Sequence, residues 1–303
     1  MKTITTINKN FNNSQEIKTS PFATYKDEKV TRYTVDCPRG HFLNDLDKAI
    51  LLCLNKYLIL TSKLLEQALR NIGLENFEQK DLQIQLKFLS QSNFVQKGEF
   101  SSPNGKSAAK FYILGNRGRA FLNSIGETVI LTNYLASLDT IGIKKVLSAN
   151  QFAIFTSDFN SDFNKVKTCQ TIFVPDTNEE KRSNIIFRPQ SLLFENDQTI
   201  IVEAIRQEDD WKTHALDKLH RINKVLNNKR KTNIEINNPS LVLICESEEH
   251  MHQVIELIAS QKLKLNILFT HDTEIYNNPK DCLYEYKPQK KGIFTSFRKN
   301  WVA

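Results

Sequence analysis

The chain has 303 residues, a formal net charge of +7 and 40% apolar residues, which suits about two ordinary globular domains. Its apolar runs are too short for a membrane span, and its polar start lacks the apolar stretch of a secretory signal. The five cysteines form no Cys-x-x-Cys pair, so we expect reduced thiols in a cytoplasmic protein. The positive charge favours a polyanionic partner.

Residues 1–42 are predicted to form a mostly disordered tail. They are rich in Asn, Thr and Lys and are interrupted by Pro21, Pro38 and Gly40. A short strand over residues 31–35 is the one regular element expected there.

A first domain is predicted over residues 43–126, beginning with two amphipathic helices. From residue 45 to residue 57 the apolar side chains recur at the spacing of one helix face, and Asn44 suits the N-cap position. A second helix is expected to start after Thr61 or Ser62 and to stop near Gly73.

The third segment, residues 78–91, fits two patterns. Every second residue from Leu82 to Phe88 is apolar, as in a strand, but Leu82, Leu86 and Leu89 also share one helix face. The flanking Glu, Gln and Lys residues favour a helix. Its outward face would present Lys80, Gln83, Lys87 and Gln91. These side chains suit phosphates and base edges, and they equally suit an ordinary solvated surface.

Two strands are predicted over residues 94–100 and 109–114, and the tip between them is rich in turn residues. The tip contains Asn104 and Lys106 and no acid, as expected of a loop that lies along a phosphate backbone. Arg117 and Arg119 follow, just before a closing helix that is expected to open at Ala120. This order resembles the winged helix-turn-helix of bacterial regulators, some of which bind only protein. The resemblance implies a set of DNA-binding residues: Lys80, Gln83, Lys87, Gln91, Asn104, Lys106, Arg117 and Arg119.

Residues 127–165 are predicted to form a helical linker, and residues 166–287 a second domain in which strands and helices alternate. Strands are expected over residues 171–174, 184–194, 199–205, 241–245, 265–270 and 282–286. Helices are expected over residues 213–226, which are strongly basic, and 247–259. Residues 288–303 form a basic tail with interleaved aromatic residues, suited to binding phosphates, docking on a partner or folding back on the chain. The predicted fold class is α+β, with α/β character in this second domain.

The second domain resembles the PD-(D/E)xK, or restriction-endonuclease-like, mixed-sheet core. In that core an acid at the start of the second strand and an acid-x-Lys on the third strand hold Mg²⁺ and activate water. Here Gln190 stands at the first acid position and Ile205 at the lysine position, so that Glu203 alone is retained. Lys212 or Lys218 on the following helix is a candidate replacement for the lysine. Glu127 or Asp197 is a candidate replacement for the missing acid.

The combination of the two domains resembles the replication-relaxation family of mobile genetic elements. Arg188, Pro189, Glu203 and Lys218 match the short marks of that family, and Gln190 departs from them. The resemblance implies an accessory protein of plasmid replication, or of the relaxosome and conjugative transfer, that binds duplex DNA without cutting it. Its partners would be double-stranded DNA and a relaxase or another transfer or replication protein, with no membrane. A homodimer is compatible with this arrangement.

Two other functions remain open at the level of sequence. The first is a metal-dependent DNA endonuclease of a mobile element. In it Glu203, Gln190 and Lys218 would be what remains of the catalytic residues, and they would still support cleavage with Mg²⁺. The second is a transcription regulator whose second domain senses a ligand. If the chain is a DNA-binding accessory protein, we expect no metal site and no cofactor.

Overall fold

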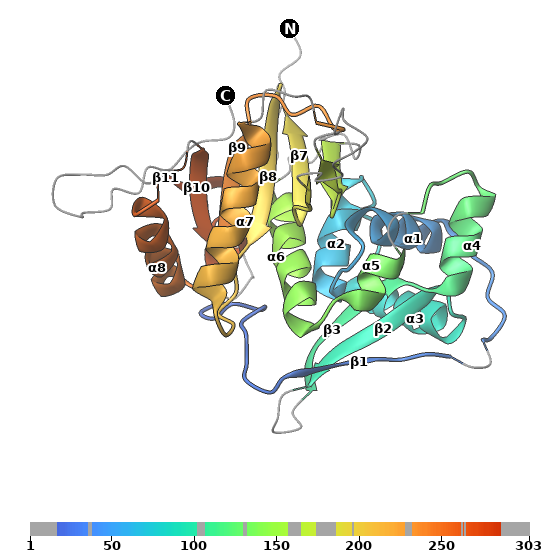
Figure 1. Cartoon of the computed structure of the whole chain (residues 1–303). Coiled ribbons are helices and arrows are strands. Elements are labelled where there is room, and N and C mark those ends of the chain that lie inside the picture. Colours follow the sequence, from blue (N-terminus) through green and yellow to red (C-terminus); the bar gives the residue numbers. More distant parts are fainter. Residues whose placement is uncertain are drawn as a thin grey trace, which may run out of the picture.

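The computed structural model describes residues 17–35, 38–101, 107–129, 132–156, 165–173, 186–195, 197–227, 232–261, 263 and 265–285. Within these residues the fold is α+β: the strands form a three-stranded, a six-stranded and a two-stranded sheet, with helices around them (Figure 1). The amino-terminal half is mainly helical, and the six-stranded sheet belongs to the carboxy-terminal half.

Three helices, a hairpin and a fourth helix make up the amino-terminal unit. In chain order they are α1 (Asp45–Tyr57), α2 (Ser62–Asn71), α3 (Gln79–Gln91), β2 (Val95–Ser101), β3 (Ser107–Leu114) and α4 (Asn116–Ser124). Asn44 caps α1 and Thr61 caps α2, each through a side-chain oxygen that accepts a backbone N–H. The ambiguous third segment is a helix, because Leu82, Leu86 and Leu89 are buried together on one face.

The hairpin has an additional strand on one side and an isolated bridge on the other. Strand β1 (Lys29–Arg32) pairs antiparallel with β2, and Leu60 forms an antiparallel bridge with Tyr112 of β3. The sequence placed these first residues in a mostly disordered tail. Residues 17–35 instead run along the molecule as an extended segment, and the ring of Phe22 is buried in the core. We call residues 17–28 the strap.

The six-stranded sheet has the order β11-β10-β9-β8-β7-β4. Its strands are β4 (Val166–Thr168), β7 (Ser191–Glu195), β8 (Gln198–Ala204), β9 (Ser240–Cys245), β10 (Asn266–His271) and β11 (Tyr284–Glu285). The central strands β8, β9 and β10 are parallel, and the other three run antiparallel to their neighbours. Parallel strands require crossovers, which α7 (Trp211–Leu226) and α8 (Glu248–Ala259) supply.

The strand predicted over residues 184–194 is interrupted. Short strand β6 (Ile186–Phe187) pairs with β5 (Ile172–Phe173) in a separate two-stranded sheet, and β7 begins only at Ser191. Pro189 lies in the break, where a residue without a backbone N–H costs no ladder hydrogen bond. The interruption leaves Gln190 beside the first residue of β7.

Both faces of the large sheet are buried. Along β8, Ile200 and Val202 belong to the core shared with the amino-terminal helices, whereas Ile201 belongs to the core under α7 and α8. This alternation follows from the two-residue period of a strand. The continuous apolar run of β9 has the same cause, because a strand covered on both sides needs no polar face.

Helix α6 (Thr140–Thr156) lies between the six-stranded sheet and α2 (Figure 1). The sequence assigned this region, after a short helix α5 (Thr132–Ser137), to a linker between domains. In the structure α6 is buried nearly all round, and the amide of Asn150 donates to the backbone carbonyls of Tyr57 and Ile59. The two halves therefore share one continuous core rather than meeting through an exposed connection.

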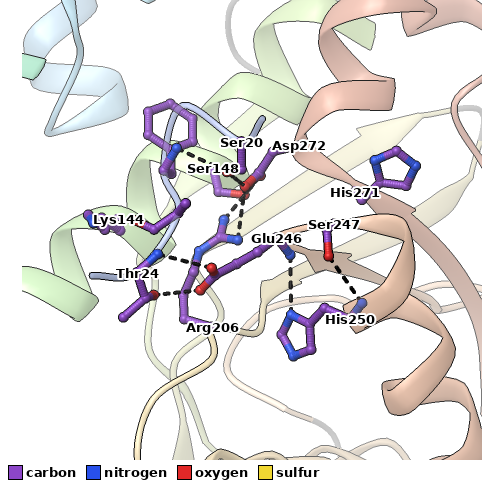
Figure 2. Close-up of polar contacts among 12 residues, drawn as sticks. Ser20, Thr24, Lys144, Ser148, Arg206, Glu246, Ser247, His250, His271 and Asp272 are labelled. Atoms are coloured by element: carbon purple, nitrogen blue, oxygen red, sulfur yellow. Dashed lines mark hydrogen bonds and ion pairs between the residues drawn. The ribbon is translucent and has the colours of Figure 1, made fainter. Parts of the chain in front are cut away.

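A fully buried ion pair joins four separate parts of the chain. Arg206, which follows β8, meets Asp272 at the start of α9 (Asp272–Asn277), with Nη1–Oδ2 and Nη2–Oδ1 distances of 3.0 and 3.1 Å. The hydroxyl of Ser148 on α6 donates to Asp272 Oδ1 at 2.5 Å, and the hydroxyl of Ser20 in the strap donates to Oδ2 (Figure 2). The short helix Pro279–Asp281 follows α9.

A second buried carboxylate fixes the next part of the strap. Glu246, just after β9, accepts from the backbone N–H and the hydroxyl of Thr24 and from the backbone N–H of Gln207 (Figure 2). Lys144 of α6 contacts Glu28 and the carbonyl of Ala23. The strap has no hydrophobic periodicity of its own, and polar contacts with residues distant in the sequence hold it in place.

Removal of the Asp272 carboxylate tests this buried ion pair. Asp272→Ala leaves the Arg206 guanidinium buried without a counter-charge, so we expect the free energy of unfolding to fall by about 3–5 kcal/mol. Chemical denaturation of the purified chain measures this change. Glu256→Ala, which removes an exposed carboxylate from α8, is the control and should alter stability by no more than about 0.5 kcal/mol. Equal effects of the two substitutions would contradict the role given to the ion pair.

Candidate functional site

The outward face of α3 carries the residues that the sequence predicted for it. Lys80, Gln83 and Lys87 are exposed. They lie at i, i+3 and i+7 and therefore form one stripe on the helix. The same face exposes two apolar side chains, Ile84 at 41% and Phe88 at 45%. The stripe therefore offers cationic, amide and apolar groups together.

Residues at both ends of α3 make polar contacts with their neighbours. At its start, the carboxylate of Asp81 accepts from the backbone N–H of Glu78, so acids occupy the first turn. At its end, Gln91 is half-buried, and its backbone carbonyl accepts a hydrogen bond from the backbone N–H of Arg39. The ring of His41 stacks on Phe88 at a centroid distance of 5.9 Å. The accessible cations of α3 are Lys80 in the first turn and Lys87 two turns further along.

The two arginines at the start of α4 have local partners. Arg117 donates to the carbonyls of Arg39 and Ser92 and lies over the ring of Phe94. Arg119 donates to the carbonyl of Leu114 and to Asn116, and burial lowers its pKa. These contacts brace α4 against the hairpin. Asn104 and Lys106, at the tip of the hairpin, lie outside the described residues.

A second cluster lies in the carboxy-terminal half, where Gln190, Glu203 and Lys218 come together. They line one pocket of about 190 Å³ between β8 and α7. Lys218 Nζ lies 2.6 Å from Glu203 Oε2, and Gln190 Oε1 accepts from the backbone N–H of Ala204 at 3.1 Å. Three residues far apart in the sequence thus meet, as the resemblance implied.

The electrostatics of this pocket are dominated by burial. Glu203 is only 3% exposed. Burial raises the pKa of its carboxyl, and the nearby Lys218 ammonium, together with Lys145, partly offsets that rise. Lys145 of α6 pairs with Glu208 at 2.5 Å. The sequence did not single out Lys145, because its helix was assigned to a linker, or Glu208, which lies in the connection between β8 and α7.

These residues do not fit a Mg²⁺ site. Mg²⁺ requires several hard oxygen ligands in octahedral geometry, whereas Glu203 and Glu208 are each paired with a lysine and Gln190 Oε1 already accepts a hydrogen bond. No cluster of three or more His, Cys, Asp or Glu residues suited to a metal occurs among the described residues. The pocket therefore contains a carboxylate, that of Glu203, whose charge is balanced by the ammonium group of Lys218.

The other residues proposed for the nuclease-like set lie elsewhere. Ile205 is buried in the core under α7 and α8. Asp197 is at the turn before β8, and about six residues of extended strand, roughly 20 Å, separate it from Glu203. Glu127 is exposed beyond α4 and does not line the pocket. Arg188 donates to the hydroxyl of Thr171 and lies over the ring of Tyr134.

Comparisons with protein-family models, with curated proteins and with solved structures find no match to this chain. Among the helices that the structure describes, none combines the length and the apolar character needed to traverse a bilayer. The function of the chain must therefore be inferred from the two sites themselves.

The Glu203–Lys218 pair makes a pH-dependent prediction. Lys218→Met removes the cation and raises the pKa of Glu203 further above its ordinary value of 4.5. The folded variant then keeps its proton to a higher pH than the folded wild type does, so the loss of stability caused by the substitution grows as pH rises through the raised pKa of Glu203 in the wild-type chain. We expect a loss of about 1–2 kcal/mol at pH 8, reduced from the value for a fully buried pair because Lys218 is 35% exposed, and a smaller loss at pH 5.

Denaturation curves at the two pH values measure this difference. Lys212→Met on the same helix removes an exposed cation and serves as the control. The double substitution Glu203→Gln with Lys218→Met should recover most of the loss at pH 8, because no buried charge remains. A loss independent of pH would refute the assignment.

Proposed function

We propose that this chain binds duplex DNA through α3 and the β2–β3 hairpin. It acts as an accessory protein of a mobile genetic element, in plasmid replication or in the relaxosome and conjugative transfer, and holds DNA without cutting it. The second half of the chain serves as a scaffold and as a contact for a relaxase or another transfer or replication protein.

The observation that carries the proposal is the exposed stripe on α3. Lys80, Gln83 and Lys87 lie on the side of the helix that faces away from the core, directly beside the hairpin. The order of α1, the Leu60 bridge, α2, α3 and the hairpin is typical of a winged helix, in which the corresponding helix enters the major groove. Lysine then contacts phosphate or guanine, and glutamine pairs with adenine.

The second half supports the reading that the chain does not cut DNA. Its strand order β4-β7-β8-β9, with α6 and α7 on opposite faces, is consistent with a PD-(D/E)xK core. Within that core, Glu203 is paired with Lys218 and Gln190 replaces the first acid. The architecture is retained while the groups for metal-dependent hydrolysis are replaced.

Charge reversal on α3 tests DNA binding. The double substitution Lys80→Glu and Lys87→Glu removes two cations and adds two anions, so we expect at least a tenfold loss of affinity for duplex DNA at 0.1 M salt. The slope of log K against log salt should fall by about two. Fluorescence anisotropy with a labelled duplex at several salt concentrations provides both quantities. Lys280→Glu, an exposed lysine on the opposite half, is the matched control.

Gln83→Ala separates sequence recognition from charge. We expect it to reduce discrimination between the preferred site and a random duplex by about 1–3 kcal/mol, with little change in the salt slope. If neither variant changes binding, or if the wild-type affinity does not depend on salt, α3 is not the interface.

A metal-dependent endonuclease is the second candidate, favoured by the convergence of Gln190, Glu203 and Lys218 in one pocket. Supercoiled plasmid incubated with the protein and Mg²⁺ or Mn²⁺ distinguishes the two. We expect no nicking above the level of Glu203→Ala, because the carboxylate is already compensated by Lys218. Nicking by the wild type that Glu203→Ala abolishes would replace the accessory role with a nuclease activity.

A further inference from the structure

A large hollow of about 660 Å³ lies beside the proposed DNA-binding face. Gln83 of α3, Lys110 of β3 and Lys63 at the start of α2 line it. Phe155 of α6 and Tyr276 of α9, which belong to the other half of the chain, line it as well. The volume falls within the range of about 300–1,000 Å³ that is usual for small-molecule sites.

The lining of this hollow is cationic. Lys63 and Lys110 contribute two ammonium groups, and no acidic residue is among the described residues that line it. The first turn of α2 also lacks an acid, so the positive end of its helix dipole is not neutralised there. Glu66, one turn along α2 from Lys63, is paired with Arg70 at 3.0 Å. An anionic group is therefore favoured near Lys63 and Lys110.

Two aromatic rings also line the hollow. The rings of Phe155 and Tyr276 lie 5.5 Å apart between centroids, at an interplanar angle of 45°. Lys63 Nζ lies 3.9 Å from the centre of the Tyr276 ring and donates to the Tyr276 hydroxyl, so the cation and this ring are in direct contact. Both rings are half-buried and line the hollow, so part of each remains open to it. A flat ring can stack on such a surface, and the amide of Gln83 can accept or donate at its edge.

From this arrangement we infer that the hollow binds a nucleotide, with its phosphate near Lys63 and Lys110 and its base against Tyr276 and Phe155. An anion joined to a planar heterocycle matches a hollow whose lining presents ammonium groups and aromatic rings next to each other. The nucleotide has two possible sources: a free nucleotide, or an unpaired nucleotide of the DNA held on α3. The second source rests on the proposed function, whereas the first does not.

Two binding measurements on the full chain test the inference. The first titrates free dAMP by calorimetry. The second compares, by anisotropy, a fully paired duplex with the same duplex carrying one unpaired adenosine at its end. Tyr276→Leu removes the stacking ring, and Lys63→Met removes a cation. Phe42→Leu, which replaces a ring that is 99% exposed and outside the hollow, is the matched control.

If the source is free nucleotide, dAMP binds and Tyr276→Leu weakens its binding about tenfold, as expected for the loss of one stacked base. If the source is DNA, the unpaired adenosine raises affinity for the duplex, and Tyr276→Leu removes that gain while leaving binding of the paired duplex unchanged. Lys63→Met should act in the same direction in either case. Phe42→Leu should change none of these values.

The inference is overturned if neither dAMP nor the unpaired adenosine binds, or if Tyr276→Leu and Phe42→Leu behave alike. It is also overturned if Tyr276→Leu weakens paired and unpaired duplexes equally. Failure of the proposed function gives a different pattern. In that case the wild-type chain does not bind the paired duplex, while the dAMP titration still measures the hollow.

Discussion

The buried pair of Arg206 and Asp272 is the constraint on which the tertiary arrangement depends. Two charges removed from water are costly unless each is fully compensated. Here compensation requires Ser20 of the strap and Ser148 of α6 as well as the two charged groups themselves. The end of β8, the start of α9, α6 and the strap must therefore assemble together, and this assembly determines where the amino-terminal unit lies against the large sheet.

Because α6 is shared by both halves, the two candidate sites belong to one body. The stripe on α3 and the hollow beside it are positioned by α2 and α9. Helix α2 contacts α6, and α9 begins at Asp272. The proposed duplex-binding face consequently continues onto the second half instead of ending at a flexible connection. This continuity explains why residues of α6 and α9 line a hollow that begins at α3.

The pocket around Glu203 and the cluster around Asp272 hold their buried carboxylates in different ways. The carboxylate is buried and compensated by one flexible lysine, whereas Asp272 is held by a guanidinium and two hydroxyl groups. The first arrangement leaves the carboxyl with a raised pKa, and the second ties separate segments together. The two buried acids therefore differ in how many neighbouring groups hold them.

The sequence by itself determined the local elements: the three helices, the hairpin, and the exposed stripe of Lys80, Gln83 and Lys87. It left Lys212 and Lys218 as alternatives, and only the structure shows that Lys218 meets Glu203. Hydrophobic periodicity reports which face of a helix or strand is buried, and strand order brings the ends of strands together. Only the tertiary structure decided that the strap is ordered, that α6 is central, and that Arg117 and Arg119 brace α4. These features depend on contacts such as that of Ser20 with Asp272, 252 residues apart, which leave no repeating pattern along the chain.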